Sequence, residues 1–371
     1  MNNITYVTYQ TFPAETANSI QTMANIKYMI RHGVDVSLVF PLREKTSTDN
    51  SEELKKFYSI KENFNIVGTK HNLPFGKINV LNRILFLYSH FLWSYLIVNK
   101  LVKEKASTEF FFTRSDWVFF FLSRNNRKVV FECHQFTKIR KFLINKSLMK
   151  EQSKIIFLNN NLKDDYEKKY ILNNNYTILH NGVDLEYYSF DSKVKNNEIV
   201  FIGKLNRFGE SRNVDFLLKA LTILDPKYTL KIVGASDLEF QDLEKESKNL
   251  GVENRVKILK RVNYSDVAKH LSTSSIGVLI NSNKNIHSIS YTSPIKYFEY
   301  LAAGLKIIAV DFPSHRSLPF SDNISFFEEN NTKSVINAIK KCEHANKLTK
   351  DNFSDISLET RTKKIIDFIK S

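Results

Sequence analysis

One segment near residue 300 has residue types and a spacing that suit binding of an anionic ligand. Ser293-Pro294-Ile295-Lys296 opens a predicted helix, and Glu299 lies within one turn of Lys296. With Pro294 at the first helical position, the neighbouring backbone N–H groups can meet a phosphate. The carboxylate of Glu299 can accept hydrogen bonds from hydroxyls such as a ribose diol. The alternative is an ordinary surface ion pair between residues three apart on an amphipathic helix.

A second segment places two cations after a glycine. The predicted strand from Ile199 ends at Gly203 and Lys204, and Arg212 stands at the start of the next predicted helix. From these positions Lys204 and Arg212 can converge on one point and neutralise a diphosphate without a metal. The sequence has no Asp-x-Asp pair for a divalent ion. The alternative is that each cation is a solvated charge.

Short runs of β-branched and aromatic residues alternate with helical stretches along the whole sequence. Because strands as apolar as these must be covered by helices on both faces, we predict a parallel α/β sheet. The expected strands are Ile4–Tyr9, Val34–Phe40, Phe64–Gly68, Phe110–Thr113, Lys128–His134, Lys154–Leu158, Glu198–Gly203, Tyr228–Gly234, Val256–Leu259, Gly277–Asn281 and Lys306–Asp311.

The alternation restarts after the turn-forming pair Asn181-Gly182. We therefore predict two Rossmann-like, doubly wound domains that face a central cleft, with ligands bound at the carboxyl ends of the strands. The expected domains are residues 1–185 and 186–355. Residues 356–371 are expected to form a helix that packs back towards the N-terminal domain.

Composition narrows the class of protein. The 371 residues are 42% hydrophobic and 25% charged, which excludes disorder and favours about two domains. A net charge of +15 indicates an anionic partner: nucleic acid, anionic lipid or a phosphorylated substrate. Cys133 and Cys342 fit neither a zinc site nor a disulfide framework and favour the reducing cytosol. We find no secretory signal, and the apolar stretch Ile84–Val98, about 15 residues, is too short to span a bilayer.

A series of motifs resembles, in order, the GT4-type glycosyltransferases of the GT-B fold, the glycosyl transferases group 1. The resemblance covers the C-terminal half and continues more weakly upstream. Its motifs are Asn181-Gly-Val-Asp184, Phe201-Ile-Gly-Lys204 with Arg212, Val233-Gly234, Ser293-Pro-Ile-Lys-x-x-Glu-Tyr-Leu-Ala-Ala-Gly304, Ile307-Ile-Ala309 and, upstream, Phe12-Pro-Ala-Glu-Thr-Ala17, Thr113-Arg114-Ser115 and Phe131-Glu-Cys-His134.

The resemblance implies a retaining, metal-independent hexosyltransferase that moves a sugar from a nucleotide diphosphate sugar to an acceptor hydroxyl. It implies no cofactor besides this co-substrate, a UDP-sugar being favoured, and no metal site. His134 then approaches the donor sugar, and with Lys204 and Arg212 forms the catalytic set. The implied donor-binding residues are Gly203, Lys204, Arg212, Gly234, Arg261, Ser293, Pro294, Ile295, Lys296 and Glu299, and the implied acceptor-side residues are Glu15, Thr16 and Arg114.

The sequence departs from the family pattern at three places. Lys204 precedes Arg212, where the family usually has Arg and then Lys. Tyr291 replaces the first glutamate of the family's E-x7-E motif, so backbone N–H groups near Ser293 are expected to contact the transferred sugar. The glycine-rich loop after the first strand is absent, since the first glycine is Gly33.

Two other classes of protein stay open as alternatives. A nucleotide-sugar epimerase of the same fold would need acid/base carboxylates, for which Glu132, Asp116 and Glu15 are the candidates. A nucleic-acid binder would explain the charge but not the Ser293 segment, and no nucleic-acid-binding motif is present. His134 could equally be a core histidine bonded to backbone. In a retaining reaction the leaving diphosphate can take the acceptor proton, so we do not assign His134 as a base.

A basic stretch raises the question of a membrane. Residues 138–154 carry six Lys and Arg and one acid, Glu151, with apolar residues between them. Such a helix can lie on an anionic membrane, or it can pack its apolar side on its own sheet. The resemblance implies synthesis of a bacterial surface polysaccharide, such as lipopolysaccharide, on a saccharide or lipid-linked acceptor. We expect a cytoplasmic protein, peripheral on the inner membrane.

Overall fold

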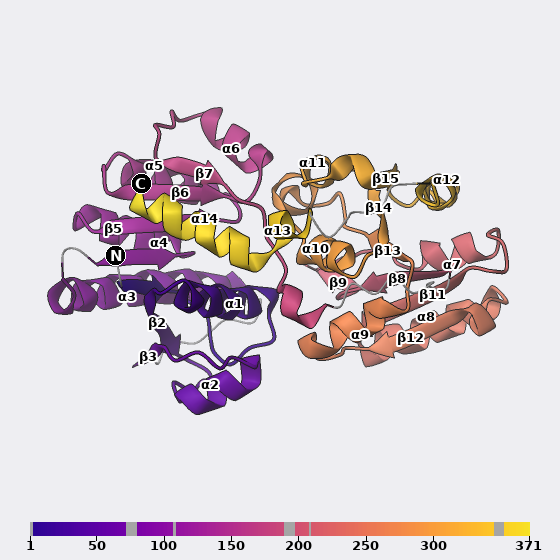
Figure 1. Cartoon of the computed structure of the whole chain (residues 1–371), viewed down its shortest axis with the longest axis horizontal. Helices are drawn as coiled ribbons and strands as arrows, with labels where there is room; N and C mark the ends of the chain where they lie inside the picture. The colour runs from indigo at the N-terminus through magenta and orange to yellow at the C-terminus, as the bar shows by residue number, and fades with distance from the viewer. Residues whose placement is uncertain (1–2, 72–79, 107–108, 189–196, 208, 345–351) are drawn as a thin grey trace. The chain divides into compact units, whose positions relative to one another are not determined.

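The computed structural model describes residues 3–71, 80–106, 109–188, 197–207, 209–344 and 352–371 (Figure 1). The chain forms two compact units. Unit 1 comprises Met1–Leu179 and Leu358–Ser371, and unit 2 comprises His180–Ser357. Each unit contains a parallel sheet with helices on both faces, which confirms the predicted α/β, doubly wound class. The predicted cleft between the domains stays a prediction.

Unit 1 has a seven-stranded parallel sheet. In order across the sheet the strands are β3 (Asn65–Lys70), β2 (Asp35–Leu42), β1 (Asn3–Val7), β4 (Phe110–Thr113), β5 (Lys128–Cys133), β6 (Ser153–Phe157) and β7 (Tyr176–Ile178). The direction of winding reverses between β1 and β4. In doubly wound sheets this switch point is where loops diverge and ligands bind.

Helices cover both faces of this sheet. They are α1 (Ala17–Arg31), α2 (Ser51–Tyr58), α3 (Val80–Glu104), α4 (Asp116–Arg124), α5 (Lys138–Leu148), α6 (Asn160–Glu167) and α14 (Leu358–Lys370). Helices α1 and α14 lie side by side (Figure 1), and their Met23 and Ile365 share one core with Ile4 of β1. On the opposite face Phe119 of α4 stacks on Phe131 of β5. Helix α4 packs between α3 and α5.

Local sequence explains where these helices begin. Thr16, Ser115, Thr137 and Asn159 stand just before α1, α4, α5 and α6. Each side-chain oxygen accepts a hydrogen bond from a backbone N–H in the first turn, at 2.9 to 3.3 Å. Hydroxyl and amide side chains at this position satisfy donors that the helix itself leaves without a partner.

Unit 2 has a six-stranded parallel sheet with the same winding. Its strands are, in order, β12 (Val256–Lys260), β11 (Thr229–Ala235), β8 (Glu198–Ile202), β13 (Ile276–Leu279), β14 (Lys306–Val310) and β15 (Ile324–Phe327). Alternate residues of β8 face opposite sides, so Phe201 joins a core with α7 (Phe216–Leu221), α8 (Asp237–Asn249) and α12 (Thr332–Cys342), and Val200 joins one with α9 (Val267–Ser272) and α10 (Ile295–Ala302). The switch point lies between β8 and β13.

Several elements were not predicted because they are short or show no clear periodicity of apolar residues. They include the strands β7 and β15. A two-stranded antiparallel hairpin, β9 (Asn206–Arg207) with β10 (Glu210–Ser211), was also missed. The remaining short elements are Leu185–Tyr187, Glu253–Arg255, Tyr264–Asp266, Ser321–Asn323, the π-helical turn His287–Tyr291, α11 (Pro313–Arg316) and α13 (Phe353–Ile356).

Helix α3 is longer than the apolar stretch chosen from the sequence. Among the described residues, its segment Ile84–Glu104 is the one helix long and apolar enough to cross a membrane by length and composition, with a mean hydropathy of 1.2. Buried helices of ordinary globular proteins meet the same test. One side of α3, with Trp93, Val98 and Leu101, is buried in unit 1.

Candidate functional site

Two strand ends of unit 2 meet at glycines. The N–H of Gly203, just after β8, donates to the carbonyl of Val233 at 2.9 Å. Gly203 and Gly234 have φ angles of +152° and +116°, which residues with a side chain rarely adopt. A Cβ atom on Gly234 would lie 2.4 Å from the carbonyl oxygen of Gly203. The two predicted donor-binding glycines therefore leave bare backbone at the carboxyl end of the sheet.

The structure brings Arg212 back to this strand end. The β9–β10 hairpin returns the chain, the N–H of Arg212 donates to the carbonyl of Leu205 at 2.8 Å, and the half-buried Arg212 side chain lies against Gly203. A Cβ atom on Gly203 would be 3.1 Å from Nη1 of Arg212. Lys204 is the next residue after Gly203 and is exposed. Arg261 is also exposed and follows β12 at the same edge of the sheet.

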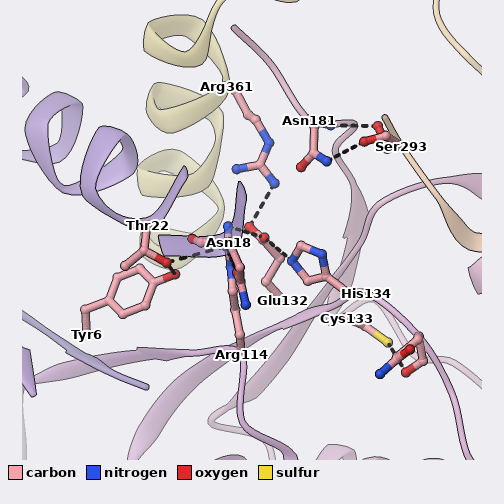
Figure 2. A network of polar contacts seen from close by, with 11 residues as sticks. Tyr6, Asn18, Thr22, Arg114, Glu132, Cys133, His134, Asn181, Ser293 and Arg361 are labelled. Carbon is pink, nitrogen blue, oxygen red and sulfur yellow. Dashed lines mark hydrogen bonds and ion pairs between the residues drawn. The ribbon is translucent and has the colours of Figure 1, made fainter. Parts of the chain in front are cut away.

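The residues before α10 are clamped by the Asn181-Gly182 turn. The N–H of Asn181 donates to Oγ of Ser293 at 3.0 Å, and its side-chain amide donates to the carbonyl of Ser293 at 2.5 Å (Figure 2). Both residues are buried. Helix α10 begins at Ile295 with Pro294 at the cap, so the predicted placement of Pro294 as the first helical residue is wrong by one position.

Glu299 is completely buried at 0% exposure. The Lys296 ammonium forms an ion pair with its Oε2, with Nζ at 2.7 Å, and apart from this ion pair no group among the described residues donates a hydrogen bond to either oxygen. The ion pair between residues three apart is therefore present, but its carboxylate is buried and does not lie on the surface. Burial, and then the negative charge of Glu299, raises the pKa of the nearby Tyr188. A buried carboxylate with unused acceptor capacity suits a ligand that brings hydroxyl donors.

Sequence reasoning missed a buried histidine near Arg212. His315 follows β14, donates from Nδ1 to the carbonyl of Val310 at 2.8 Å, and accepts at Nε2 from the side-chain amide of Asn281 at 3.2 Å. Burial lowers the pKa of His315 to about 4, and the positive charge of Arg212 acts in the same direction. Asn281, two residues past the end of β13, was the available signal, because it lies beside the switch point.

In unit 1, His134 lies just after β5 and bonds to Glu132 (Figure 2). Nε2 of His134 is 2.7 Å from Oε1 of Glu132. Glu132 is fully buried, with Nη2 of Arg114 at 2.6 Å from Oε1 and Nη2 of Arg361 at 2.8 Å from Oε2. The partner of His134 is thus a side-chain carboxylate, and the alternative of a histidine bonded to backbone is wrong.

The charges of this network fix the proton positions. Burial opposes ionisation of Glu132, but Arg114 and Arg361 together lower its pKa well below the ordinary value. An ionised carboxylate can only accept, so His134 donates from Nε2. Burial lowers the pKa of His134, against the effect of its bond to Glu132. A neutral His134 then has Nδ1 as its remaining acceptor.

The predicted acceptor-side residues cluster at the start of α1 but differ in exposure. Glu15 and Thr16 are exposed, and Thr16 caps the helix. The side chain of Arg114 is 3% exposed. It donates to Oδ1 of Asn18 at 2.5 Å and pairs with Glu132, which favours a role inside the network over direct contact with an acceptor.

Two of the three carboxylates proposed for an epimerase, Glu132 and Asp116, are already engaged in ion pairs. Glu132 is held as described, and Oδ2 of Asp116 accepts from Nε of Arg140 at 2.9 Å. Although burial opposes it, the positive charge of Arg140 lowers the pKa of Asp116. Both groups are ionised and ion-paired, which disfavours their use as proton donors.

A further polar cluster beyond the end of β1 was also missed. The hydroxyl of Tyr9 lies 2.6 Å from Oγ of Ser89, which is 2.7 Å from Nε2 of His71. The guanidinium of Arg43 stacks on the Tyr9 ring, with Cζ 3.8 Å from the ring centre, and donates to the Tyr9 carbonyl at 2.8 Å. The position of Tyr9, two residues past the end of β1, was the only signal in the sequence.

No group of three or more His, Cys, Asp or Glu that could hold a metal ion occurs among the described residues. The site residues that the structure brings together in unit 2 are instead Gly203, Arg212, Gly234 and, around the start of α10, Ser293 to Glu299.

Comparisons with known proteins agree with this arrangement. Residues 188–354 match the family model of the glycosyl transferases group 1. No curated protein matches the sequence. Among solved structures, sucrose-phosphate synthase from Thermosynechococcus elongatus matches with a TM-score of 0.74 and 14% identity, over 100% of this chain and 98% of its own.

Two further structures match over 99% of both chains. The HepE protein of Anabaena, in complex with UDP and glucose, has a TM-score of 0.65 and 14% identity. The lipopolysaccharide outer core galactosyltransferase WaaB, in its apo form, has a TM-score of 0.64 and 12% identity. The chain therefore has the two-unit GT-B fold of these proteins, and its residues 188–354 are similar to the glycosyl transferases group 1 family.

Proposed function

We propose that the protein transfers a hexosyl group from a UDP-sugar to a saccharide or lipid-linked acceptor, with retention of anomeric configuration and without a metal. The observation that carries the proposal is Glu299, a fully buried carboxylate in α10 whose one charged partner among the described residues is the Lys296 ammonium at Oε2. A ribose diol supplies two such donors. The complex of the similar HepE protein with UDP and glucose supports UDP as the nucleotide.

The diphosphate is assigned to the end of β8. Two negative charges need compensation, and Arg212 beside the bare backbone of Gly203, with Lys204 next to it, supplies two cations. The first N–H groups of α10 add an anion-binding helix end. Backbone near Ser293 contacts the transferred sugar, and backbone near Gly234 and Arg261 contacts the base.

Retention follows from attack on the same face from which the diphosphate leaves. The bond from the sugar C1 to the diphosphate oxygen breaks, the bond from C1 to the acceptor oxygen forms, and the acceptor proton passes to the leaving diphosphate. No enzymic base is needed. His134, neutral and held by Glu132, accepts a hydrogen bond at Nδ1 from a hydroxyl of the transferred sugar.

Calorimetry with UDP tests the donor site. Lys204→Ala and Arg212→Ala should each weaken UDP binding by about 1.5 to 3 kcal/mol, the range for charged hydrogen bonds. Lys219→Ala is the matched control, because Lys219 is an exposed cation of unit 2 on α7. Unchanged affinity in both site variants would refute the assignment.

Two activity measurements test the reaction itself. Turnover should persist in excess EDTA, and loss of turnover would show that a metal takes part. NMR of the product from an α-linked donor should show an α-linkage. A β-linked product would mean inversion and would require a base, which the engaged carboxylates Glu132 and Asp116 do not provide.

We also propose that the setting is the inner membrane, where a surface polysaccharide grows on a lipid carrier. Of the six cations in residues 138–154, three are engaged inside unit 1: Arg140 with Asp116, Lys141 with Asp165, and Lys154 with the carbonyl of Phe368. Lys138, Lys146 and Lys150 are exposed. Charge on α5 alone is therefore weaker support than the sequence indicated.

The stronger support is the outer layer of unit 1, formed by α3, α4 and α5. Phe91 of α3 packs edge-on against Trp117 of α4, with ring centres 4.9 Å apart, so the helices present one surface. By sequence these three helices carry eight Lys and Arg and two acids. This excess of positive charge favours an anionic lipid surface as the partner of these three helices. The exposed apolar side chains of the layer are Ile84, Leu85, Leu87, Tyr88, Phe91, Tyr95 and Leu96 on α3 and Ile139 and Phe142 on α5 with Met149 after it.

Sedimentation with liposomes tests this surface. Replacing Ile84, Leu87 and Tyr88 together by Ser should reduce binding to anionic vesicles by removing buried apolar area, at about 25 cal/mol per Å². Replacing Lys138, Lys146 and Lys150 by Ser should reduce the salt dependence of binding, by about 1 kcal/mol per charge at low salt. Ile223→Ser and Leu238→Ser, on exposed positions of unit 2, are controls. Equal binding by all variants, or none by the wild type, would refute a membrane role.

A further inference from the structure

Arg361 reaches the network around His134 from a distant part of the sequence. It lies in the first turns of α14, and its side chain is 4% exposed. Its Nη2 donates to Oε2 of Glu132 at 2.8 Å, across a separation of 229 residues (Figure 2). Neither the motifs nor the fold pattern singles out this arginine.

Each oxygen of Glu132 has its own partners. Oε2 accepts from Arg361, and Oε1 faces Arg114 and His134. Arg114 is itself fixed by donation to Asn18 of α1. A guanidinium at each oxygen leaves the carboxylate little freedom to rotate, so the direction in which Oε1 meets the His134 ring is set.

We propose that Arg361 is a positioning residue for His134, acting through Glu132 to fix the orientation and the Nε2–H tautomer of the ring. Carboxylates that orient a histidine through its second nitrogen are a general device in active sites. The inference rests on the proposed function for the contact of His134 with the transferred sugar. The orientation of the ring can be measured without that contact.

The charged groups around His134 come from several elements. Glu132 belongs to β5, Arg114 follows β4, and Arg361 belongs to α14. Tyr6 of β1 is close to the same charges, and burial raises its pKa, so it stays neutral. Loss of the Arg361 charge should therefore raise the pKa of His134, since that charge is one of those that lower it.

Three variants separate positioning from general support of the fold. Arg361→Met removes both the positive charge and the planar guanidinium, and Arg361→Lys keeps the charge but not the guanidinium. Arg127→Met is the matched control, because Arg127 is also buried in unit 1, at the other end of β5, and donates to the carbonyls of Val102 and Lys105. It contacts neither Glu132 nor His134 in any described interaction.

Nitrogen-15 NMR of histidine-labelled full chain reads the ring directly. In the wild type His134 should show the Nε2–H tautomer throughout its neutral range. Arg361→Met should give a mixture of tautomers and a raised pKa for His134, Arg361→Lys should restore most of the wild-type signal, and Arg127→Met should leave it unchanged. A wild-type tautomer in Arg361→Met would overturn the proposal, as would the same change in Arg127→Met.

Kinetics across pH connect the ring to turnover. Arg361→Met should lower kcat roughly 10- to 100-fold, as loss of an orienting group does, with little change in KM for the UDP-sugar. The acid limb of its profile should move to higher pH. If the tautomer changes in Arg361→Met but kcat does not, the positioning role stands and the proposed contact between His134 and the sugar fails.

Discussion

Two glutamates, one in each unit, are buried to the same degree but differ in how many groups surround their carboxylates. Glu132 and Glu299 are both 0% exposed. Glu132 has two guanidinium groups and an imidazole within 2.8 Å. Glu299 has only the Lys296 ammonium at 2.7 Å and no hydrogen bond to either oxygen among the described residues.

This difference separates a carboxylate that belongs to the fold from one that is available to a ligand. Buried polar groups are nearly always hydrogen-bonded in native proteins, since leaving one unsatisfied costs about 1 to 3 kcal/mol. Each oxygen of Glu132 has a charged partner within unit 1. Glu299 is incomplete, and the sequence places it in the segment with the most specific family motif.

The same substitution at the two sites should give the largest contrast. Glu132→Gln removes the only carboxylate between Arg114 and Arg361, and breaking a buried ion pair in this way costs about 3 to 5 kcal/mol. Glu299→Gln should change stability by less than about 1 kcal/mol, because it breaks one ion pair and leaves a Lys296 side chain that is 28% exposed and can be solvated. Unfolding in urea measures both, and equal losses in the two variants would remove the distinction.

For the affinity of UDP we expect the opposite order, with the larger effect in Glu299→Gln. Glu299→Gln keeps the shape and one acceptor but loses the charge, so UDP binding should weaken by about 1.5 to 3 kcal/mol. The pH profile of turnover should keep its shape, because Glu299 is not a proton donor. Calorimetry with UDP on both variants makes the comparison, and Glu132→Gln should bind UDP like the wild type. A large loss of rate at unchanged donor affinity would instead indicate a catalytic acid.

A buried histidine in each unit should also affect the stability of the fold, by a smaller amount and in a pH-dependent way. Burial lowers the pKa of His90 in unit 1 and of His315 in unit 2 from 6.5 to about 4. Each lowered pKa stabilises the fold fully above pH 6.5, and this stability is lost as the pH falls towards 4. At pH 5.5 each histidine should have lost about 1.4 kcal/mol.

Thermal unfolding between pH 7.5 and pH 5 checks this expectation. His90→Gln and His315→Gln should each flatten the fall in Tm on the acid side, and the double variant should flatten it further. An unchanged slope in a single variant would show that the corresponding histidine titrates normally.

Much of the fold was predictable because its signals are local. The apolar strands and the Asn181-Gly182 turn can each be recognised from a few consecutive residues. The two parallel sheets could be inferred from these local patterns. The start of α10 was misplaced by one residue because Pro294 fits both the cap and the first turn. The length of helix α3 was underestimated because its last turns contain polar residues.

The candidate site was less predictable where it depends on distant contacts. Gly203 and Arg212 could be chosen because they stand at a predicted strand end and helix start, and Glu299 because it lies within one helical turn of Lys296. Arg361 and His315 could not, since their roles come from partners that only the folded chain brings together. A sequence pattern also cannot show that Glu299 is buried, which is the observation that distinguishes it from a surface ion pair.

The path of the chain has a consequence for biosynthesis. Unit 2 is continuous, but unit 1 needs residues 358–371, which are made after all of unit 2. Arg361 leaves the ribosome 229 residues after Glu132, a delay of roughly 10 to 50 s at 5 to 20 residues per second. During that interval a nascent unit 1 has Arg114 and His134 as partners for Glu132 but lacks Arg361, while unit 2 has all of its residues for folding. The contact that orients His134 is therefore among the last that translation allows to form.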